Sequence, residues 1–159
     1  MPTTRGKSAE AIEMLKQDHA KAQKAFKEFE KMDRADAETC RQFVRTVCDD
    51  LKVHGTLEEE IFYPAVRELI EDEDIMNEAA VEHETAKMLI EQLENMEGDD
   101  PNYYATFTVL GEYVAHHVEE EEGEMLPQAS KSGLDFEALA ARMQERKAEL
   151  MAQLEQAPA

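Results

Sequence analysis

All five histidines of this chain fall in two halves of the sequence that repeat each other. The first half gives His19 and then His54, and the second gives His83 and then His117. The intervals match, at 35 residues in the first half and 34 in the second. Scattered surface histidines would not share such a spacing, and neutral imidazole is the commonest metal ligand among side chains. The repeat therefore predicts a shared metal-binding role for these four histidines.

A glutamate follows the later histidine of each half by four residues. His54 is followed by Glu58 and His117 by Glu121, in the segments HGTLEEEIFYP and HVEEEEGEMLP. Residues four apart in a helix are neighbours on one face. A carboxylate buried in a helical core costs on the order of several kcal/mol unless it is paired or coordinates a metal. The pairs therefore predict a cation site, and nitrogen and carboxylate donors without cysteine suit iron, manganese or zinc.

The elements that must position these residues are helices. Apolar residues recur every three or four positions in four long segments, which predicts an all-α fold. All four repeated histidines and both glutamates lie on the apolar stripes of these segments, so we expect them to point inward. In chain order the stripes run from Ile12 to Phe29, Phe43 to Leu69, Met76 to Leu93 and Tyr103 to Glu121.

Turn-forming residues separate the four segments, at 33–36, 71–74 and 98–101. Short links between long helices predict antiparallel neighbours in an up-down-up-down four-helix bundle, over residues of about 8–128. A further helical pattern over about 134–155 predicts a C-terminal helix packed outside the bundle, with a frayed end. We expect residues 1–159 to form a single domain.

The composition narrows the classes of partner. The chain carries 37 acidic and 17 basic residues, a net charge of −20. This charge opposes binding to nucleic acid, which depends on neutralising phosphates, and to anionic membrane surfaces. No apolar run reaches the roughly 20 residues that a membrane-spanning helix needs, and MPTTRGKSAE lacks the apolar core of a signal peptide. We therefore expect a cytoplasmic protein with no nucleic-acid or membrane partner, whose oligomeric state the sequence leaves unknown.

The two cysteines are not expected to form a disulfide. Cys40 and Cys48 lie on one predicted helix, separated by about 12 Å along its axis at the usual helical rise. That separation is too long for a disulfide, so both are interpreted as core or boundary residues.

Together these motifs resemble the hemerythrin family, in its bacterial HHE cation-binding branch. The resemblance covers residues from about 8 to 150 and includes six ligand positions, both histidine-to-proline segments and the C-terminal helix. It implies two non-haem irons joined by an oxo or hydroxo bridge. By this likeness His19 and His54 hold one iron, His83 and His117 hold the other, and the two glutamates, Glu58 and Glu121, bridge them. The ferritin-like pattern, in which histidine follows glutamate by three residues, is absent.

One position departs from the oxygen-carrying hemerythrins, which have a fifth histidine one turn after the third. That position is Lys87 here. The resemblance then implies an open coordination position on both irons, and such a site favours binding or reduction of hydrogen peroxide, O2 or nitric oxide, in oxidative or nitrosative stress defence. Catalase-like or peroxidase-like activity stays open. The alternative is an iron or oxygen sensor, an iron store or an iron donor for iron-centre repair, without turnover.

His116 is a rival ligand in the second half. It also has a glutamate four residues later, Glu120. The repeat nevertheless aligns His117 with His54, and this alignment favours His117 as the ligand.

Other polar residues near the motifs leave alternatives open. Tyr63 and Tyr113 can reach the site or donate a hydrogen bond beside it, although ordinary packing is favoured for both. Lys87 either steadies a bound anion or extends from the edge of the bundle into solvent. A solvated acidic face is the favoured interpretation of Glu59, Glu60, Glu119, Glu120 and Glu122, and the alternative is that one of them supports iron entry or a ligand.

Overall fold

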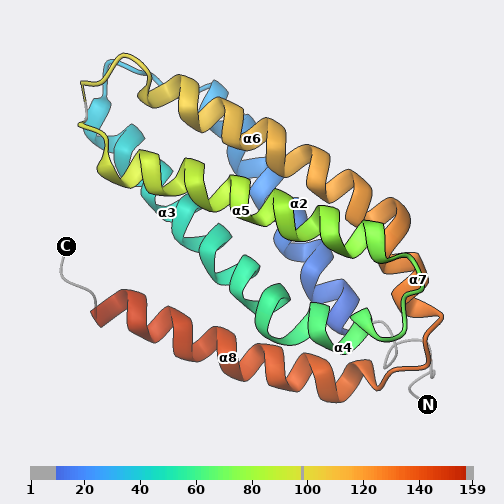
Figure 1. Cartoon of the computed structure of the whole chain (residues 1–159). Helices are drawn as coiled ribbons and strands as arrows, with labels where there is room; N and C mark the ends of the chain where they lie inside the picture. Colours follow the sequence, from blue (N-terminus) through green and yellow to red (C-terminus); the bar gives the residue numbers. More distant parts are fainter. Residues whose placement is uncertain (1–9, 98, 157–159) are drawn as a thin grey trace.

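The structure is a computed structural model that describes residues 10–97 and 99–156. The predicted start of the bundle near residue 8, the glycine of the 98–101 turn and the last three residues lie outside this part. Within the described ranges every regular element is a helix, so the all-α class is confirmed (Figure 1).

Four long helices surround the interior of the molecule. They are α2 (Glu10–Glu30), α3 (Ala37–Leu57), α5 (Glu73–Asn95) and α6 (Tyr103–Glu120). Helix α2 packs against α3, α3 against α5, α5 against α6 and α6 against α2, which closes a ring (Figure 1). Side chains cap two of these helices, since Asp36 and Asp72 accept hydrogen bonds from backbone amides three residues later. The ring fits the expected bundle, and its up-down-up-down order stays a prediction.

Helices α3 and α6 each continue into a wider, π-helical turn. The turns are η1 (Glu58–Phe62) and η2 (Glu121–Met125), and the short helices α4 (Tyr63–Arg67) and α7 (Leu126–Ser130) follow them. Each turn closes on the carbonyl of its first glutamate, which accepts a hydrogen bond from the amide five residues later. A proline comes next in both copies and has no N–H to continue the α-helical ladder. Such π-helical turns occur frequently at functional sites.

Helix α8 (Phe136–Gln156) packs along the outside of α2 and α3 (Figure 1). It buries Phe136, Leu139, Ala140 and Met143 against them and the neighbouring turns. A helix outside the ring was expected at this place. Leu69, in contrast, was wrongly assigned to an apolar stripe: it is 47% exposed, because α4 ends at Arg67.

The apolar core divides into two clusters, with the repeated histidines between them along the helices. One cluster surrounds Leu57, Phe62 and Met125, and the other surrounds Phe29 and Phe107. Within the described residues, four polar or charged side chains are buried: His19, Glu58, His83 and Glu121. Both cysteines are buried and free, as interpreted from the sequence.

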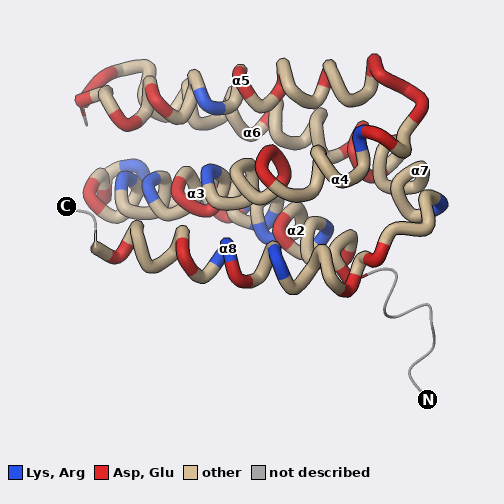
Figure 2. The backbone as a smooth tube through the Cα atoms, turned by 60° about the horizontal axis from the view of Figure 1, so that its bottom comes forward, with Lys and Arg blue, Asp and Glu red and all other residues tan. Residues whose placement is uncertain are grey.

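Charge is unevenly distributed over the surface. Acidic residues lie along every long helix, whereas basic residues gather on α2, α3 and α8 (Figure 2). Helix α6 carries no lysine or arginine, and α5 carries only Lys87. No helix in the described ranges combines the length and the apolar character needed to cross a bilayer.

We expect Gly111→Ala to lower the free energy of unfolding by about 1 kcal/mol. A Cβ at position 111 would lie 2.7 Å from Cδ1 of Phe26, whose ring packs against Phe107. Overpacking costs about 1–3 kcal/mol, which exceeds the gain of up to about 1 kcal/mol in helix propensity. Urea denaturation measures the change. Gly123→Ala is the control, because nothing lies within 4 Å of its added Cβ; equal effects of the two changes would contradict the packing argument.

Candidate metal centre

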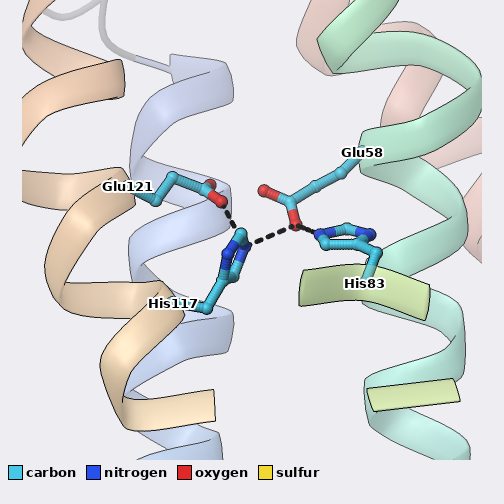
Figure 3. Close-up of side chains that lie close together, drawn as sticks. All are labelled: Glu58, His83, His117 and Glu121. Atoms are coloured by element: carbon cyan, nitrogen blue, oxygen red, sulfur yellow. Dashed lines mark ion pairs between the residues drawn. The ribbon is translucent and has the colours of Figure 1, made fainter. Parts of the chain in front are cut away.

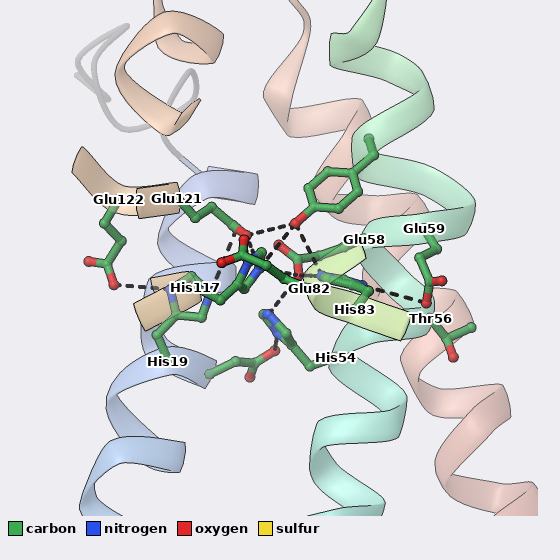
Figure 4. A network of polar contacts seen from close by, with 12 residues as sticks. His19, His54, Thr56, Glu58, Glu59, Glu82, His83, His117, Glu121 and Glu122 are labelled. Atoms are coloured by element: carbon green, nitrogen blue, oxygen red, sulfur yellow. Dashed lines mark hydrogen bonds and ion pairs between the residues drawn. The ribbon is translucent and has the colours of Figure 1, made fainter. Parts of the chain in front are cut away.

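The structure brings all six predicted ligand side chains together between the four long helices (Figure 4). One histidine comes from each long helix, and the two glutamates begin the two π-helical turns. The six are His19, His54, Glu58, His83, His117 and Glu121.

Glu58 is at the centre of this cluster. Its Oε1 atom lies 3.1 Å from Nε2 of His54 and 3.1 Å from Nε2 of His83. Nε2 of His117 is 3.9 Å from the same oxygen (Figure 3). The side chain is 0% exposed, so histidines from both halves of the sequence approach one fully buried carboxylate.

Glu121 also meets histidines from both halves. Its Oε2 lies 2.8 Å from Nε2 of His117, and its Oε1 lies 3.7 Å from Nε2 of His19. The imidazole rings pair as the resemblance implies: His19 and His54 have ring centroids 4.9 Å apart, and so have His83 and His117. Two histidine pairs with two carboxylates between them form a donor set suited to two neighbouring cations.

Several atoms that face this space have no hydrogen-bond partner. Among the described buried side chains they are Nε2 of His19 and of His54, both carboxylate oxygens of Glu58, and Oε1 of Glu121. An unsatisfied buried polar group costs about 1–3 kcal/mol, and more when it is charged. Imidazole nitrogens and carboxylate oxygens all donate electron pairs to cations, so these residues fit a metal at this place.

Carboxylates on the outer side of the cluster contact Nδ1, the second imidazole nitrogen, of each repeated histidine. Asp18 accepts a hydrogen bond from Nδ1 of His54 at 2.9 Å, and Glu82 accepts one from Nδ1 of His117 at 2.9 Å. A metal-binding imidazole usually donates its second N–H in this way, which fixes the tautomer and leaves Nε2 free as the ligand.

The remaining two histidines have the same kind of partner from the opposite helices. Nδ1 of His19 is 3.0 Å from Glu122, and Nδ1 of His83 is 3.6 Å from Glu59 (Figure 4). The interpretation of Glu59 and Glu122 as part of a solvated face was therefore wrong, because each is only about one-third exposed and turned toward an imidazole.

The repeat contains a signal for these four carboxylates that the sequence analysis did not use. Asp18 and Glu82 each precede the first histidine of their half, and Glu59 and Glu122 each follow the buried glutamate of their half. An acidic residue is thus repeated at every position that supports a histidine.

Tyr63 belongs to the site, and the preference for ordinary packing was wrong for this residue. Its hydroxyl donates a hydrogen bond to Glu121 at 2.8 Å and lies 3.2 Å and 3.3 Å from Nε2 of His83 and His117. Burial and two nearby carboxylates raise the tyrosine pKa, so the hydroxyl keeps its proton. Leu126 takes the corresponding position in the second half, whereas Tyr113 is 46% exposed.

The two remaining alternatives lie at the surface. His116 is 63% exposed and contacts Glu120 and Glu82 on the outer side of α6, so it is His117 that enters the cluster. Lys87 is half exposed and forms ion pairs with Glu59 and Glu84, at the edge of the bundle.

Protons compensate part of the negative charge in the absence of metal. Burial opposes protonation of His54 and His117. The negative charge of Glu58 and the hydrogen bond with Asp18 nevertheless raise the pKa of His54 to about 10, and the hydrogen bond with Glu121 raises the pKa of His117 to about 11. Burial and the charge of Glu58 raise the pKa of Glu121 to about 7. Burial would also raise the pKa of Glu58, but the positive charge of His54 holds it well below its usual range.

Comparisons with known proteins agree with this geometry. The family model described as the hemerythrin HHE cation binding domain matches residues 10–129. The crystal structure of a hemerythrin HHE cation binding domain-containing protein from Mycobacterium kansasii superposes with a TM-score of 0.74. The match has 19% sequence identity and covers 92% of this chain and 93% of that one, which shows a shared fold.

A curated relative, a DNA nickase from Nostoc sp., is 24% identical over 143 residues. The match covers 84% of this chain but only 40% of that relative.

We expect metal loading at pH 7 to release between two and three protons per chain. His54 and His117 must each lose a proton before they can bind a metal, and Glu121, with a pKa of about 7, loses about half a proton on average. Protons compete with the metal, so the apparent affinity should rise as the pH increases from 6 to 8. Anaerobic calorimetric titration with ferrous iron, in two buffers of different ionisation enthalpy, measures the release. The same binding heat in both buffers would contradict this expectation.

We expect Asp18→Asn and Glu82→Gln each to weaken metal binding by about 10- to 100-fold, because an amide no longer holds the imidazole as a carboxylate does. Competition with a chromophoric chelator measures the affinity. Glu84→Gln is the matched control, since Glu84 also adjoins His83 in sequence but is 74% exposed. A loss of the same size in the control would show a general effect of surface charge.

Proposed function

The chain belongs to the family of hemerythrin HHE cation binding domains, and from that premise we propose that it is a non-haem di-iron protein that binds or reduces a small oxidant. The oxidant would be hydrogen peroxide, O2 or nitric oxide, and the setting oxidative or nitrosative stress defence in the cytoplasm. His19 and His54 would bind one iron and His83 and His117 the other. Glu58 and Glu121 would bridge them together with an oxo or hydroxo group.

The unpartnered atoms of the buried cluster carry this proposal. Oε1 of Glu58 lies 3.1 Å from Nε2 of His54 and of His83, and neither carboxylate oxygen of Glu58 has a hydrogen-bond partner. Core packing alone does not explain a fully buried carboxylate with no hydrogen bond, since apolar residues of similar volume would cost less. A pair of cations in contact with both halves of the cluster satisfies all of these atoms together.

The number of donors supports reactivity over simple storage. Four imidazoles and two bridging carboxylates leave each cation below the six ligands that iron commonly takes, and Lys87 at the bundle edge adds none. When bound, the irons supply the redox electrons and the Lewis acidity of the site. The carboxylates beside the histidines keep the imidazoles in one tautomer.

Tyr63 is positioned to donate a hydrogen bond or a proton within the site. Its hydroxyl is buried beside Glu121 and both histidines of the second pair, and its raised pKa keeps it neutral. A protonated hydroxyl at this position can donate a hydrogen bond to an oxygen atom of a ligand bound beside His83 and His117. The first pair has no equivalent group, because Leu126 occupies the repeated position.

DNA cleavage, the activity in the name of the Nostoc relative, is not what we propose for this chain. More than half of that relative lies outside the match. The net charge of −20 and the scarcity of basic residues on α5 and α6 oppose binding to phosphates. We therefore propose that the protein binds neither nucleic acid nor membranes.

The decisive experiment is to express the protein with iron, measure metals per chain and record the visible spectrum before and after adding hydrogen peroxide, while following oxygen release. We expect two irons per chain, an absorption band that changes with peroxide, and oxygen evolution. His54→Ala should lose most of the iron, whereas His116→Ala, which removes an exposed histidine, should keep it. Tyr63→Phe should retain both irons but slow turnover at least tenfold, within the range that general acid catalysis contributes.

Each other outcome has a distinct meaning. Two irons without turnover would favour the sensor, storage or iron-donor alternative. Substoichiometric metal in the wild-type protein, or equal metal content in the His54 and His116 variants, would overturn the proposal.

A further inference from the structure

A cavity of about 590 Å³ adjoins the metal centre and continues between the helices. Its lining includes the four ligand histidines and Glu58. Pockets that bind drug-sized organic molecules measure about 300–1,000 Å³, whereas one water takes about 30 Å³ in the liquid. Peroxide, O2 and nitric oxide are close to water in size, so the cavity is much larger than any of these ligands requires.

Small side chains at repeated positions open the space directly beside the site. Ala22 and Ala86 lie three residues after His19 and His83, on the same helix faces, and both line the cavity. Farther from the site the walls are apolar and include Leu51, Ile90 and Val114. Larger apolar residues at the two alanine positions would have filled this volume with core, as elsewhere in the bundle.

The charged residues of the lining do not favour an anionic ligand. Each of its lysines has a carboxylate partner: Lys21 pairs with Asp50, Lys24 with Glu28, Lys52 with Glu94, Lys87 with Glu59 and Lys147 with Asp18. No lysine of the lining is therefore left to neutralise a carboxylate or phosphate.

We propose that this cavity binds an uncharged, largely apolar organic molecule with one terminal oxygen function, of the chemistry shared by alcohols and organic hydroperoxides. The apolar body lies between the helices against Ala22 and Ala86. The oxygen end faces Glu58 and the histidines. In the metal-free protein its hydroxyl hydrogen can be donated to an oxygen of Glu58 that has no hydrogen-bond partner. This inference deepens the proposed function by naming the ligand class of the same site, but binding itself rests on the cavity and not on the metal.

The test is calorimetric titration with cumyl alcohol, a compact uncharged probe, on metal-free and iron-loaded protein. We expect one saturable site per chain and a negative heat-capacity change from apolar burial. Ala22→Leu and Ala86→Leu should each weaken binding at least tenfold by filling the cavity. Ala20→Leu and Ala80→Leu are the matched controls, with the same change at exposed positions of the same two helices, and should stay within twofold of wild type. On the metal-free protein, benzoate, an anion of similar size, should bind at least tenfold more weakly than cumyl alcohol, because every lysine of the lining already has a carboxylate partner.

No saturable binding of cumyl alcohol to the wild-type protein, in either metal state, would overturn the inference. Equal affinity in all four variants would also overturn it, because the probe would then bind elsewhere. Circular dichroism and iron content, measured on the same samples, separate this result from the proposed function. Two irons per chain without probe binding leaves the di-iron proposal intact, and probe binding without stoichiometric iron leaves the cavity inference intact.

Discussion

The burial of two carboxylates, Glu58 and Glu121, is the constraint on which the rest of the structure depends. Removing a charged carboxylate from water costs on the order of several kcal/mol unless opposite charge and hydrogen bonds replace the water. Here one histidine from each long helix approaches these two side chains, with the shortest separations near 3 Å. The helices are therefore held together by apolar packing at both ends and by a polar cluster between them that is balanced only when cations or protons are present.

The outer carboxylates connect the buried cluster to the surface, and each of these carboxylates contacts an imidazole. Each repeated histidine lies between a buried glutamate and an acidic side chain that is partly exposed. Partial exposure reduces the desolvation cost of the outer charge while its contact still orients the ring. The orientation that a metal needs is thus built into the protein before any metal binds.

The sequence predicted which six residues form the buried cluster better than it predicted the surroundings of that cluster. The six inner residues stood out because histidine is rare in this chain and a charged residue on an apolar stripe is unusual. The outer acids did not stand out, because acidic residues are abundant and a partner such as Glu122 for His19 lies 103 positions away. The π-helical turns were also missed, since one extra residue in a turn hardly disturbs an apolar periodicity that alternates between three and four. Tyr63 was misjudged because an aromatic residue on a helix face predicts packing, and its hydroxyl partner is 58 residues away.

The differences between the two halves carry as much information as their similarity. Duplication explains why two histidine pairs and two glutamates converge, and by itself it would produce two equivalent metal positions. Tyr63 has Leu126 as its counterpart, so only the pair formed by His83 and His117 has a buried hydroxyl beside it. A ligand that lies between the pairs therefore meets a proton donor on one side and none on the other. Under the function we propose, that asymmetry would let a site with nearly symmetric donors polarise a bound oxidant in one direction, which reversible binding alone would not require.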